Sequence, residues 1–421
     1  MTTYLPRLLD SELDTYLDTF GAVLIKGPKW CGKTTTALQR AHSTIKLQDP
    51  QRSREYMKMA DIAPHLLLKG EYPRLIDEWQ MVPLLWDAVR STVDEEQKAG
   101  MFILTGSAVP RDEDTLHSGT GRIARLLMRP MSLYESQDSS GAISLQSLFD
   151  GTADVEGTRS NLTIEHLAYT IARGGWPASL GKTDEQSLLI AREYIASLAE
   201  SDVSRVDGIS RNPGRVTAIL RAYARNISTL ASNTTILQDV QAQDTTLSES
   251  SFYSYVTALN RLYVFEDIPA WSPALRSKTA IRSTPKKGFI DPSLAVGALG
   301  IGYQELLQEP TTFGFLFEAL CIRDLRIYSQ AHGGVVSYYH DRQGLECDCV
   351  VHLRDGRYAL IEVKLGSREI DEGAEHLVKL KSLIEEKKMK SPSFLMVLTG
   401  GAVAYTRADG VKVVPVGCLR D

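Results

Sequence analysis

The chain has 421 residues, of which 43% are hydrophobic and 24% are charged, as in ordinary globular proteins. This composition excludes a disordered or fibrous chain, and the length predicts two or three domains of about 100–200 residues each. The net charge of −5 excludes a polycation, so any contact with nucleic acid must come from a local basic patch.

The N-terminal sequence MTTYLPRLLDSELD carries charges where a signal peptide has an apolar core, and no run approaches the roughly 18 apolar residues of a membrane span. The five cysteines are scattered along the chain. Cys347 and Cys349 are too close for the usual zinc pair, and alternation along a strand predicts that they share one buried face. We therefore expect reduced thiols, no membrane segment and a cytoplasmic location.

The first predicted elements surround a glycine-rich loop. Residues 1–20 have apolar side chains at roughly helical spacing, and residues 22–25 predict a strand. The next segment, GPKWCGKT at residues 27–34, fits the pattern G-x-x-x-x-G-K-[ST], and a helix is predicted directly behind it. In that context backbone N–H groups close around phosphate oxygens. The candidate nucleotide-binding residues are Gly27, Pro28, Lys29, Trp30, Cys31, Gly32, Lys33, Thr34 and Thr35.

Within this loop the residue types predict ATP and Mg²⁺ as cofactors. Lys33 is expected to reach the β- and γ-phosphates, and the Thr34 hydroxyl is expected to ligate Mg²⁺. Residues 74–80 (RLIDEWQ) form an apolar strand that ends in two acids. Asp77 is the candidate that holds Mg²⁺ through water, and Glu78 the candidate that orients the attacking water. The alternatives are a chance loop and a strand that happens to end in an acidic turn.

Two further segments supply candidates for the same site. The buried strand predicted at residues 100–107 ends near Thr105 and Ser107, which are candidate sensors of the γ-phosphate or of the water; a simple turn is the alternative. Arg122 follows a glycine turn and is a candidate for stabilising charge on the γ-phosphate, in the same chain or across a homo-oligomer interface. An ordinary surface salt bridge explains Arg122 equally well.

The order GPKWCGKTT, LIDEW, FILTGSA and GTGRIARLLMRPMSLYE resembles a widespread prokaryotic family of AAA-type ATPases. Members of that family carry a C-terminal domain of unknown function, often with a nuclease-like end. The GGWP segment at residues 174–177 and the WSPAL segment at residues 271–275 are similar to further elements of the family. The resemblance is specific over the first 135 residues and weaker afterwards. It implies an ATP-hydrolysing AAA-type domain with a parallel sheet over residues 1–135.

The middle of the chain is predicted to be helical. Residues 136–160 are rich in Ser, Gly and Asp, which indicates a boundary or a loose insertion within a helical linker region over residues 136–205. Residues 206–290 give a helix, a turn, a helix capped near Ser248 and a strand at residues 263–267, a layout typical of a winged helix. Its recognition helix would span residues 250–260.

Such domains bind DNA in many proteins and contact proteins in others. A cluster of basic residues without an acid between them predicts a phosphate-contacting loop, with a solvated surface loop as the alternative. Its members are Arg276, Lys278, Arg282, Lys286 and Lys287.

The last segment, residues 291–421, resembles the PD-(D/E)xK nuclease core, which is a restriction-endonuclease-like α/β fold. Period-two alternation places Glu362 and Lys364 on one face of a strand, and Asp348 lies across a predicted hairpin from them. Asp348 and Glu362 are the candidate Mg²⁺ ligands, and Lys364 is the candidate that orients water and neutralises charge. Glu318 on the preceding helix is a candidate further ligand. The alternative is a salt-bridged set of strand residues in a domain that does not cut.

Together these patterns predict an α/β chain with an AAA-type P-loop domain, a helical or winged-helix middle and a nuclease-like C-terminal domain. The predicted function is ATP hydrolysis that couples nucleotide state to a DNA-binding, possibly nuclease, C-terminal region. The alternative is a nucleotide-gated regulatory switch that binds DNA or protein and whose nuclease-like domain is inactive.

Overall fold

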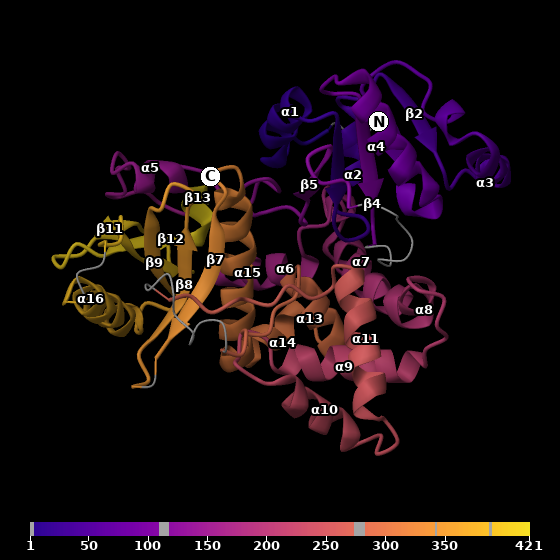
Figure 1. The fold of residues 1–421 in the computed structure, drawn as a ribbon. Coiled ribbons are helices and arrows are strands. Elements are labelled where there is room, and N and C mark those ends of the chain that lie inside the picture. Colours follow the sequence, from indigo (N-terminus) through magenta and orange to yellow (C-terminus); the bar gives the residue numbers. More distant parts are fainter. Residues whose placement is uncertain (1–3, 109–117, 273–282, 342, 387–389) are drawn as a thin grey trace.

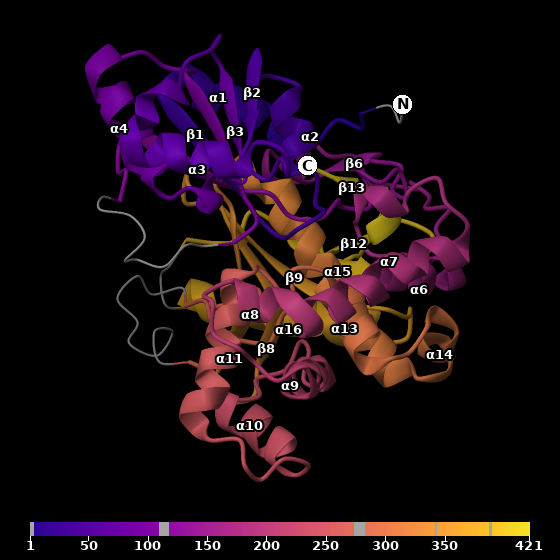
Figure 2. The same ribbon diagram turned by 90° about the vertical axis from the view of Figure 1, so that its right-hand side faces the viewer.

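The part of the chain that the structure describes folds around two large β-sheets, with most of its helices in a layer beside them. The computed structural model describes residues 4–108, 118–272, 283–341, 343–386 and 390–421. Figures 1 and 2 both place the N-terminal sheet above the helical layer, and Figure 1 shows the C-terminal sheet to one side. In these ranges no helix is long and apolar enough to cross a lipid bilayer.

The N-terminal sheet is entirely parallel, with the strand order β2-β3-β4-β1-β5. Its strands are β1 (Ala22–Lys26), β2 (Ser43–Lys46), β3 (Arg74–Asp77), β4 (Phe102–Gly106) and β5 (Ile123–Leu127). All five carboxyl ends therefore meet at one edge of the sheet. This order places β4 between the strand that enters the glycine-rich loop and the strand that ends at Asp77.

Helices cover both faces of this sheet, as parallel strands require. They are α1 (Leu9–Thr19), α2 (Lys33–Leu38), α3 (Ser53–Ile62) and α4 (Leu84–Glu96). Val23 and Ile25 of β1 pack on the side of α1 and α2, whereas Ala22 and Leu24 pack on the side of α3 and α4. The predicted N-terminal helix and the predicted parallel α/β domain are therefore both present.

The middle of the chain is helical, as predicted. Its helices are α6 (Ile164–Arg173), α7 (Asp184–Ser197), α8 (Val203–Arg205), α9 (Pro213–Arg225), α10 (Asn233–Gln241), α11 (Glu249–Arg261), α13 (Pro292–Leu299) and α14 (Tyr303–Gln308). The Ser248 hydroxyl accepts the Ser251 N–H at 3.2 Å, so α11 begins at the predicted cap. Helices α13 and α14 pack against α6, α7 and α9, so the helical layer continues past residue 291, where the sequence predicted a boundary.

The strand predicted after α11 is not formed as a regular strand. Only isolated bridges, Phe265 to Phe289 and Ile268 to Lys286, join the two segments 264–271 and 284–290. We call these two segments the wing. A further bridge joins Ala270 of the wing to Tyr338, at the edge of the C-terminal sheet. The wing therefore connects the helical layer to that sheet.

The C-terminal sheet has six strands in the order β11-β12-β10-β9-β8-β7. They are β7 (Val335–His340), β8 (Glu346–His352), β9 (Tyr358–Lys364), β10 (Leu395–Thr399), β11 (Tyr405–Thr406) and β12 (Lys412–Pro415). Strands β7 to β9 are antiparallel, and β10 is parallel to β9. Helix α15 (Pro310–Gln330) packs on one face, and α16 (Ile370–Glu386) packs on the other. The order of elements is thus helix, three antiparallel strands, helix, parallel strand.

A β-bulge interrupts the pairing of β7 with β8. Ser337 pairs with Val350 and Tyr339 with Cys347, so Tyr338 alone lies opposite both Asp348 and Cys349. The extra residue turns the two cysteines to opposite faces: Cys347 packs in the cluster that contains α16, and Cys349 in the cluster that contains α15. The predicted common face is wrong, although all five cysteines are buried and unpaired.

Residues 136–160 are packed rather than loosely inserted. Strand β6 (Ile143–Ser144) pairs with β13 (Leu419–Arg420), and α5 (Leu145–Phe149) follows it. The Phe149 ring meets the Phe394 ring edge-on at a centroid distance of 5.0 Å. This segment packs on the C-terminal sheet. Its apolar residues belong to the hydrophobic core that this sheet shares with the helical layer.

Candidate functional sites

The glycine-rich loop lies at the carboxyl edge of the N-terminal sheet. Gly27 and Gly32 have φ values of 152° and 106°, which residues with a side chain rarely adopt. A Cβ atom on Gly27 would lie 2.1 Å from the Met128 carbonyl oxygen. Both glycines are therefore required for the loop to bend sharply beside the end of β5.

The loop brings the predicted magnesium residues together. The Thr34 Oγ1 donates a hydrogen bond to Oδ1 of Asp77 at 2.7 Å, and the Thr105 Oγ1 donates to the same oxygen at 2.7 Å. Lys33 is only 5% exposed, and its Nζ donates to the Pro28 carbonyl oxygen at 2.6 Å within the loop. Thr34 at the start of α2, Asp77 at the end of β3 and Thr105 in β4 thus meet at one position, and the buried Lys33 ammonium lies within the adjoining loop.

Hydrogen bonds to Thr105 and Ser107, at the end of β4, hold Glu78 next to Asp77. Its backbone is left-handed, with φ 57°, and its N–H donates to Thr105 Oγ1 at 3.1 Å. Ser107 donates from Oγ to Oε2 of Glu78 at 2.7 Å, and Gln80 Nε2 donates to the same oxygen. Left-handed non-glycine residues cost about 1–3 kcal/mol and cluster at functional sites. Sequence reasoning missed Gln80, although it lies two positions after Glu78.

Arg122 lies at the other edge of the sheet. Its carbonyl oxygen accepts the Ala22 N–H at 3.1 Å, at the amino end of β1. Its half-exposed guanidinium pairs with Asp94 at 2.6 Å. The structure therefore does not bring Arg122 to the glycine-rich loop of its own chain, and the pair matches the salt-bridge interpretation. A role for Arg122 across a subunit interface stays a prediction.

Residues of the helical layer contact the side chains of Lys29 and Trp30 on the outer side of the loop. Lys29 Nζ lies 2.6 Å from Oδ1 of Asp202, and the Trp30 ring meets the Tyr194 ring edge-on at 5.6 Å. Asp202 is the last residue of a π-helical turn, Leu198–Asp202, and such turns are frequent at functional sites. Thr35 is exposed on α2. No local sequence pattern indicates the pairing of Lys29 with Asp202.

A buried arginine fixes the inner side of the loop. Arg7 donates to the carbonyl oxygens of Cys31 and Arg129, at 2.8 Å each. Its guanidinium also pairs with Glu135 at 2.9 Å, and both side chains are buried. The shape of the loop is therefore tied to the segment that leaves the N-terminal domain.

The GGWP segment connects three parts of the chain. Gly175 accepts the Met131 N–H at 2.6 Å and donates its own N–H to Asp291 at 3.0 Å. Trp176 is fully buried and donates to Ser293 Oγ at 3.0 Å, and its ring stacks on Tyr194. Since Tyr194 also contacts Trp30, the GGWP segment is connected to the glycine-rich loop through these aromatic rings.

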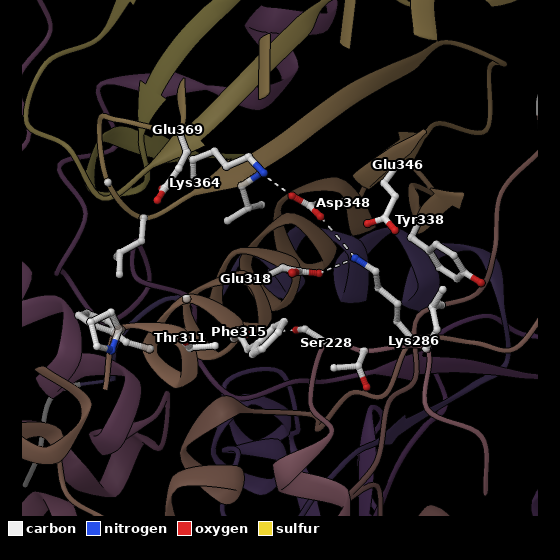
Figure 3. A pocket seen from close by; sticks show the side chains of 18 of the residues that line it. Ser228, Lys286, Thr311, Phe315, Glu318, Tyr338, Glu346, Asp348, Lys364 and Glu369 are labelled. Atoms are coloured by element: carbon white, nitrogen blue, oxygen red, sulfur yellow. Dashed lines mark hydrogen bonds and ion pairs between the residues drawn. The ribbon is translucent and has the colours of Figure 1, made fainter. Parts of the chain in front are cut away.

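The second candidate site lies at one end of the C-terminal sheet, in an open cavity of about 870 Å³ between α15 and strands β7 to β9. Asp348 accepts the Val363 N–H at 3.0 Å, and Glu362 pairs with Lys364 at 3.0 Å. Glu318 extends from α15 toward Asp348, as Figure 3 shows. Glu318, Asp348 and Lys364 line this cavity, whereas Glu362 is buried beside it and reaches it only through its pair with Lys364.

Burial and neighbouring charges change the pKa values of the carboxyl groups at this second site. Burial and the nearby Asp348 carboxylate raise the pKa of Glu362 to about 8, and burial raises the pKa of Glu318 to about 7. Burial opposes ionisation of Asp348 as well, but the ammonium groups of Lys286 and Lys364 outweigh it and lower its pKa. Glu362 Oε1 is buried and has no hydrogen-bond partner among the described residues.

Lys286 enters this site from the wing. It is 7% exposed, and its Nζ lies 2.9 Å from Glu318 and 3.4 Å from Asp348. Lys287 is 3% exposed and pairs with Asp267. The prediction of a phosphate-contacting loop is therefore wrong for these two lysines. Its other members lie outside the described residues: Arg276, Lys278 and Arg282.

The donor set of the second site suits a hard cation. Glu318, Asp348 and Glu362 supply carboxylate oxygens, the ligands that Mg²⁺ prefers, and Glu362 has an unpaired oxygen. Within the described ranges, however, no three His, Cys, Asp or Glu side chains converge as a ready metal site. Instead the Lys286 ammonium lies between two of the carboxylates.

The exposed face of α11, the predicted recognition helix, has no cation. Its exposed residues are Glu249, Ser250, Tyr253, Thr257 and Asn260. Affinity for DNA depends largely on lysine and arginine contacts to phosphates. This face therefore gives no support to DNA recognition by α11.

Comparison with known families divides the chain into three parts. Residues 19–137 match the family described as AAA domain. Residues 164–305 match a domain of unknown function (DUF8612), and residues 313–419 match another domain of unknown function (DUF4143). Together with the site geometry, the first match identifies residues 19–137 as an AAA-type P-loop ATPase domain. The comparison with curated proteins gives no match.

Similar solved structures share little sequence with this chain. A Walker-type ATPase of Pyrococcus abyssi is 14% identical, with 70% of this chain and 96% of that chain covered, at a TM-score of 0.42. A STAND protein with a tetratricopeptide-repeat sensor from Pyrococcus horikoshii is 14% identical, with 79% and 50% covered, at 0.22. Drosophila ORC bound to DNA is 11% identical, with 73% and 93% covered, at 0.22. These similarities are too low to support a conclusion.

Proposed function

We propose that the N-terminal domain hydrolyses ATP with Mg²⁺ and that its nucleotide state controls the C-terminal domain. The observation that carries this proposal is the pair of 2.7 Å hydrogen bonds by which Thr34 and Thr105 meet on Asp77. A hydroxyl and a carboxylate placed in this way beside a phosphate-binding loop are the residues that hold Mg²⁺ in P-loop enzymes.

In this proposal each side chain has a separate task. Lys33 would leave the Pro28 carbonyl oxygen and reach the β- and γ-phosphates. Thr34 and Asp77 would hold Mg²⁺, which would supply positive charge against the charge that develops on the phosphates. Glu78 accepts a hydrogen bond from the attacking water and orients it toward the γ-phosphorus. Ser107 fixes the Glu78 carboxylate through their 2.7 Å hydrogen bond.

The ATPase proposal is tested with two substitutions and one control. Lys33→Ala should abolish ATP binding, because the phosphates lose their buried cation. Glu78→Gln should keep ATP binding and lower kcat at least about 100-fold, since positioned general bases contribute about 10²–10⁴. Arg52→Ala, which removes an exposed ion pair to Glu55, is the matched control. Unchanged hydrolysis in both site variants would exclude this function.

For the C-terminal domain we propose a PD-(D/E)xK-like site directed at DNA phosphodiesters. The order α15, β7, β8, β9, α16, β10 and the grouping of Asp348, Glu362 and Lys364 support it. Asp348 and Glu362 would hold a divalent cation, whose Lewis acidity stabilises the developing charge. Lys364, paired with Glu362, would orient the attacking water. Cleavage of plasmid DNA with Mn²⁺ that disappears in both Asp348→Ala and Lys364→Ala is the expected result.

Helix α15 is the proposed connection between the two sites. At its C-terminal end, Gln330 donates to the Leu127 carbonyl oxygen at 3.1 Å and to Glu12 at 2.9 Å, so the helix touches β5 and α1. In its middle, Asp324 accepts the Leu133 N–H at 3.0 Å. The same helix carries Glu318 to the C-terminal cavity. A shift of the N-terminal domain would therefore move Glu318 as part of a rigid element.

The second candidate function is a nucleotide-gated switch that binds DNA or protein and cuts nothing. One observation favours it: the Lys286 ammonium pairs with both Glu318 and Asp348, the carboxylates that a metal-dependent nuclease would need. Measurement of ATP affinity with and without DNA separates the candidates, because coupling between two ligands must be reciprocal. Reciprocal coupling without cleavage would favour the switch, and cleavage that depends on Asp348 would favour the nuclease.

A further inference from the structure

The position of Lys286 is set by the fold. The wing docks on β7: Trp271 N–H donates to the Tyr338 carbonyl oxygen at 2.6 Å, and the Tyr338 N–H donates to Pro269 at 3.0 Å. Tyr338 is the residue opposite the β-bulge that contains Asp348. The docking of the wing and the β-bulge that contains Asp348 therefore occur at the same point of the sheet.

Hydrogen bonds hold the backbone of Lys286 at this point. Its N–H donates to Ile268 at 3.0 Å, and its carbonyl oxygen accepts the Ile268 N–H at 2.9 Å. The Tyr338 hydroxyl donates to the Thr284 carbonyl oxygen at 2.6 Å, and Lys286 Nζ lies 5.8 Å from the centroid of the Tyr338 ring. The side chain consequently has a short, enclosed path that ends between Glu318 and Asp348.

A divalent cation and this ammonium need the same oxygens. Glu318 Oε1 and Asp348 Oδ1 are the atoms nearest to Lys286 Nζ, and Figure 3 shows the ammonium between them. Mg²⁺ binds carboxylate oxygens at about 2.0–2.1 Å, so a metal on both acids leaves no space for the ammonium. Two positive groups at one position also repel each other strongly in a buried site. Glu362, which interacts with Asp348, has a buried Oε1 atom without a hydrogen-bond partner among the described residues.

We propose that Lys286 is an internal cation that competes with a divalent metal ion for Glu318 and Asp348. The inference rests on the proposed function of these acids as metal ligands. The Lys286 ammonium occupies the position that a metal ion bound to both carboxylates would take. Metal binding requires the Lys286 side chain to leave the two carboxylates, which makes the wing a regulator of this site.

The test is a titration of the full-length protein with Mn²⁺ in the absence of nucleotide and DNA, followed by the EPR signal of the free ion. Lys286→Met removes the ammonium and keeps a similar length of side chain. We expect Lys286→Met to bind one Mn²⁺ at least tenfold more tightly than the unsubstituted protein. Lys286→Arg retains a cation and should bind Mn²⁺ as weakly as the unsubstituted protein.

The double variant Lys286→Met, Asp348→Asn identifies the site, because it should lose the tight Mn²⁺. If Mn²⁺ binds through Asp348 equally well with and without Lys286, the competition is excluded while the carboxylates remain metal ligands. If no variant binds Mn²⁺ through Asp348, both the competition and the proposed metal site are excluded. Lys286→Gln, which keeps hydrogen-bond donors without charge, repeats the titration in case Lys286→Met does not fold.

Discussion

The Nζ atom of Lys29 in the phosphate-binding loop lies 2.6 Å from Oδ1 of Asp202, which is 173 residues further along the chain. This ion pair joins the ATPase domain to the helical layer at the point where the phosphates of a nucleotide would bind. In the proposed site, Asp202 would hold this cation of the loop away from those phosphates.

Asp202→Asn should release Lys29 toward the phosphates and remove a carboxylate from their vicinity. We expect ATP to bind several-fold more tightly, with little change in melting temperature, since partly exposed ion pairs contribute about 0–1 kcal/mol. Titration with a fluorescent ATP analogue at two salt concentrations measures the effect. The control is Lys29→Ala in the same background, which should reverse the gain; weaker binding by Asp202→Asn would contradict this role of the ion pair.

Asp77→Asn tests the magnesium site. Asparagine keeps the oxygen that accepts the hydrogen bonds of Thr34 and Thr105 but loses the negative charge. We expect the affinity for ATP with Mg²⁺ to fall at least tenfold, because hard cations prefer charged oxygen ligands, and the affinity for ATP with EDTA to stay unchanged. Calorimetric titrations under both conditions provide the comparison. Equal losses under both conditions would show a structural role of Asp77.

Trp176→Ala should destabilise the protein by about 3–5 kcal/mol, because it empties the volume of a fully buried aromatic ring. The same change removes the partner of Ser293 and the stacking surface of Tyr194. Urea denaturation measures the difference, with Ile209→Ala at an exposed position as the control. A loss below about 1 kcal/mol would show that the GGWP segment does not support the fold in this way.

We expect Asp138 to make the free energy of unfolding depend on pH in the acidic range. Burial alone would raise its pKa, but hydrogen bonds from His166 and Arg173 outweigh burial and lower the pKa to about 2. Since the folded pKa is below the unfolded value of 3.8, the stabilisation is present above pH 3.8 and is lost as the pH falls toward 2. This stabilisation amounts to about 2 kcal/mol, as calculated from the difference between the folded and unfolded pKa values of Asp138.

Asp138→Asn removes that carboxylate. The variant should be less stable than the unsubstituted protein at pH 7, and the difference should shrink as the pH falls from about 4 to about 2. Free energies of unfolding measured over this range test the prediction. A difference that stays constant with pH would show that the charge of Asp138 does not stabilise the fold.

The sequence alone determined the local parts of the nucleotide site. The spacing of Gly27, Gly32 and Lys33 predicts the loop, and a strand that ends in Asp77 and Glu78 predicts the second half of the site. The structure places these two segments side by side because the carboxyl ends of parallel strands meet at one edge of a sheet. The cap at Ser248 was also predictable, since a serine hydroxyl and a nearby N–H form it locally.

Only the tertiary structure decided which distant residues meet these parts. Asp202 pairs with Lys29, and Arg122 lies at the opposite edge of its sheet, where it pairs with Asp94. Lys286 pairs with both Glu318 and Asp348. A β-bulge changed the faces of Cys347 and Cys349, because one extra residue shifts a two-residue period. Local sequence patterns fix which side chains an element presents, whereas the docking of separate elements fixes the charges that surround them.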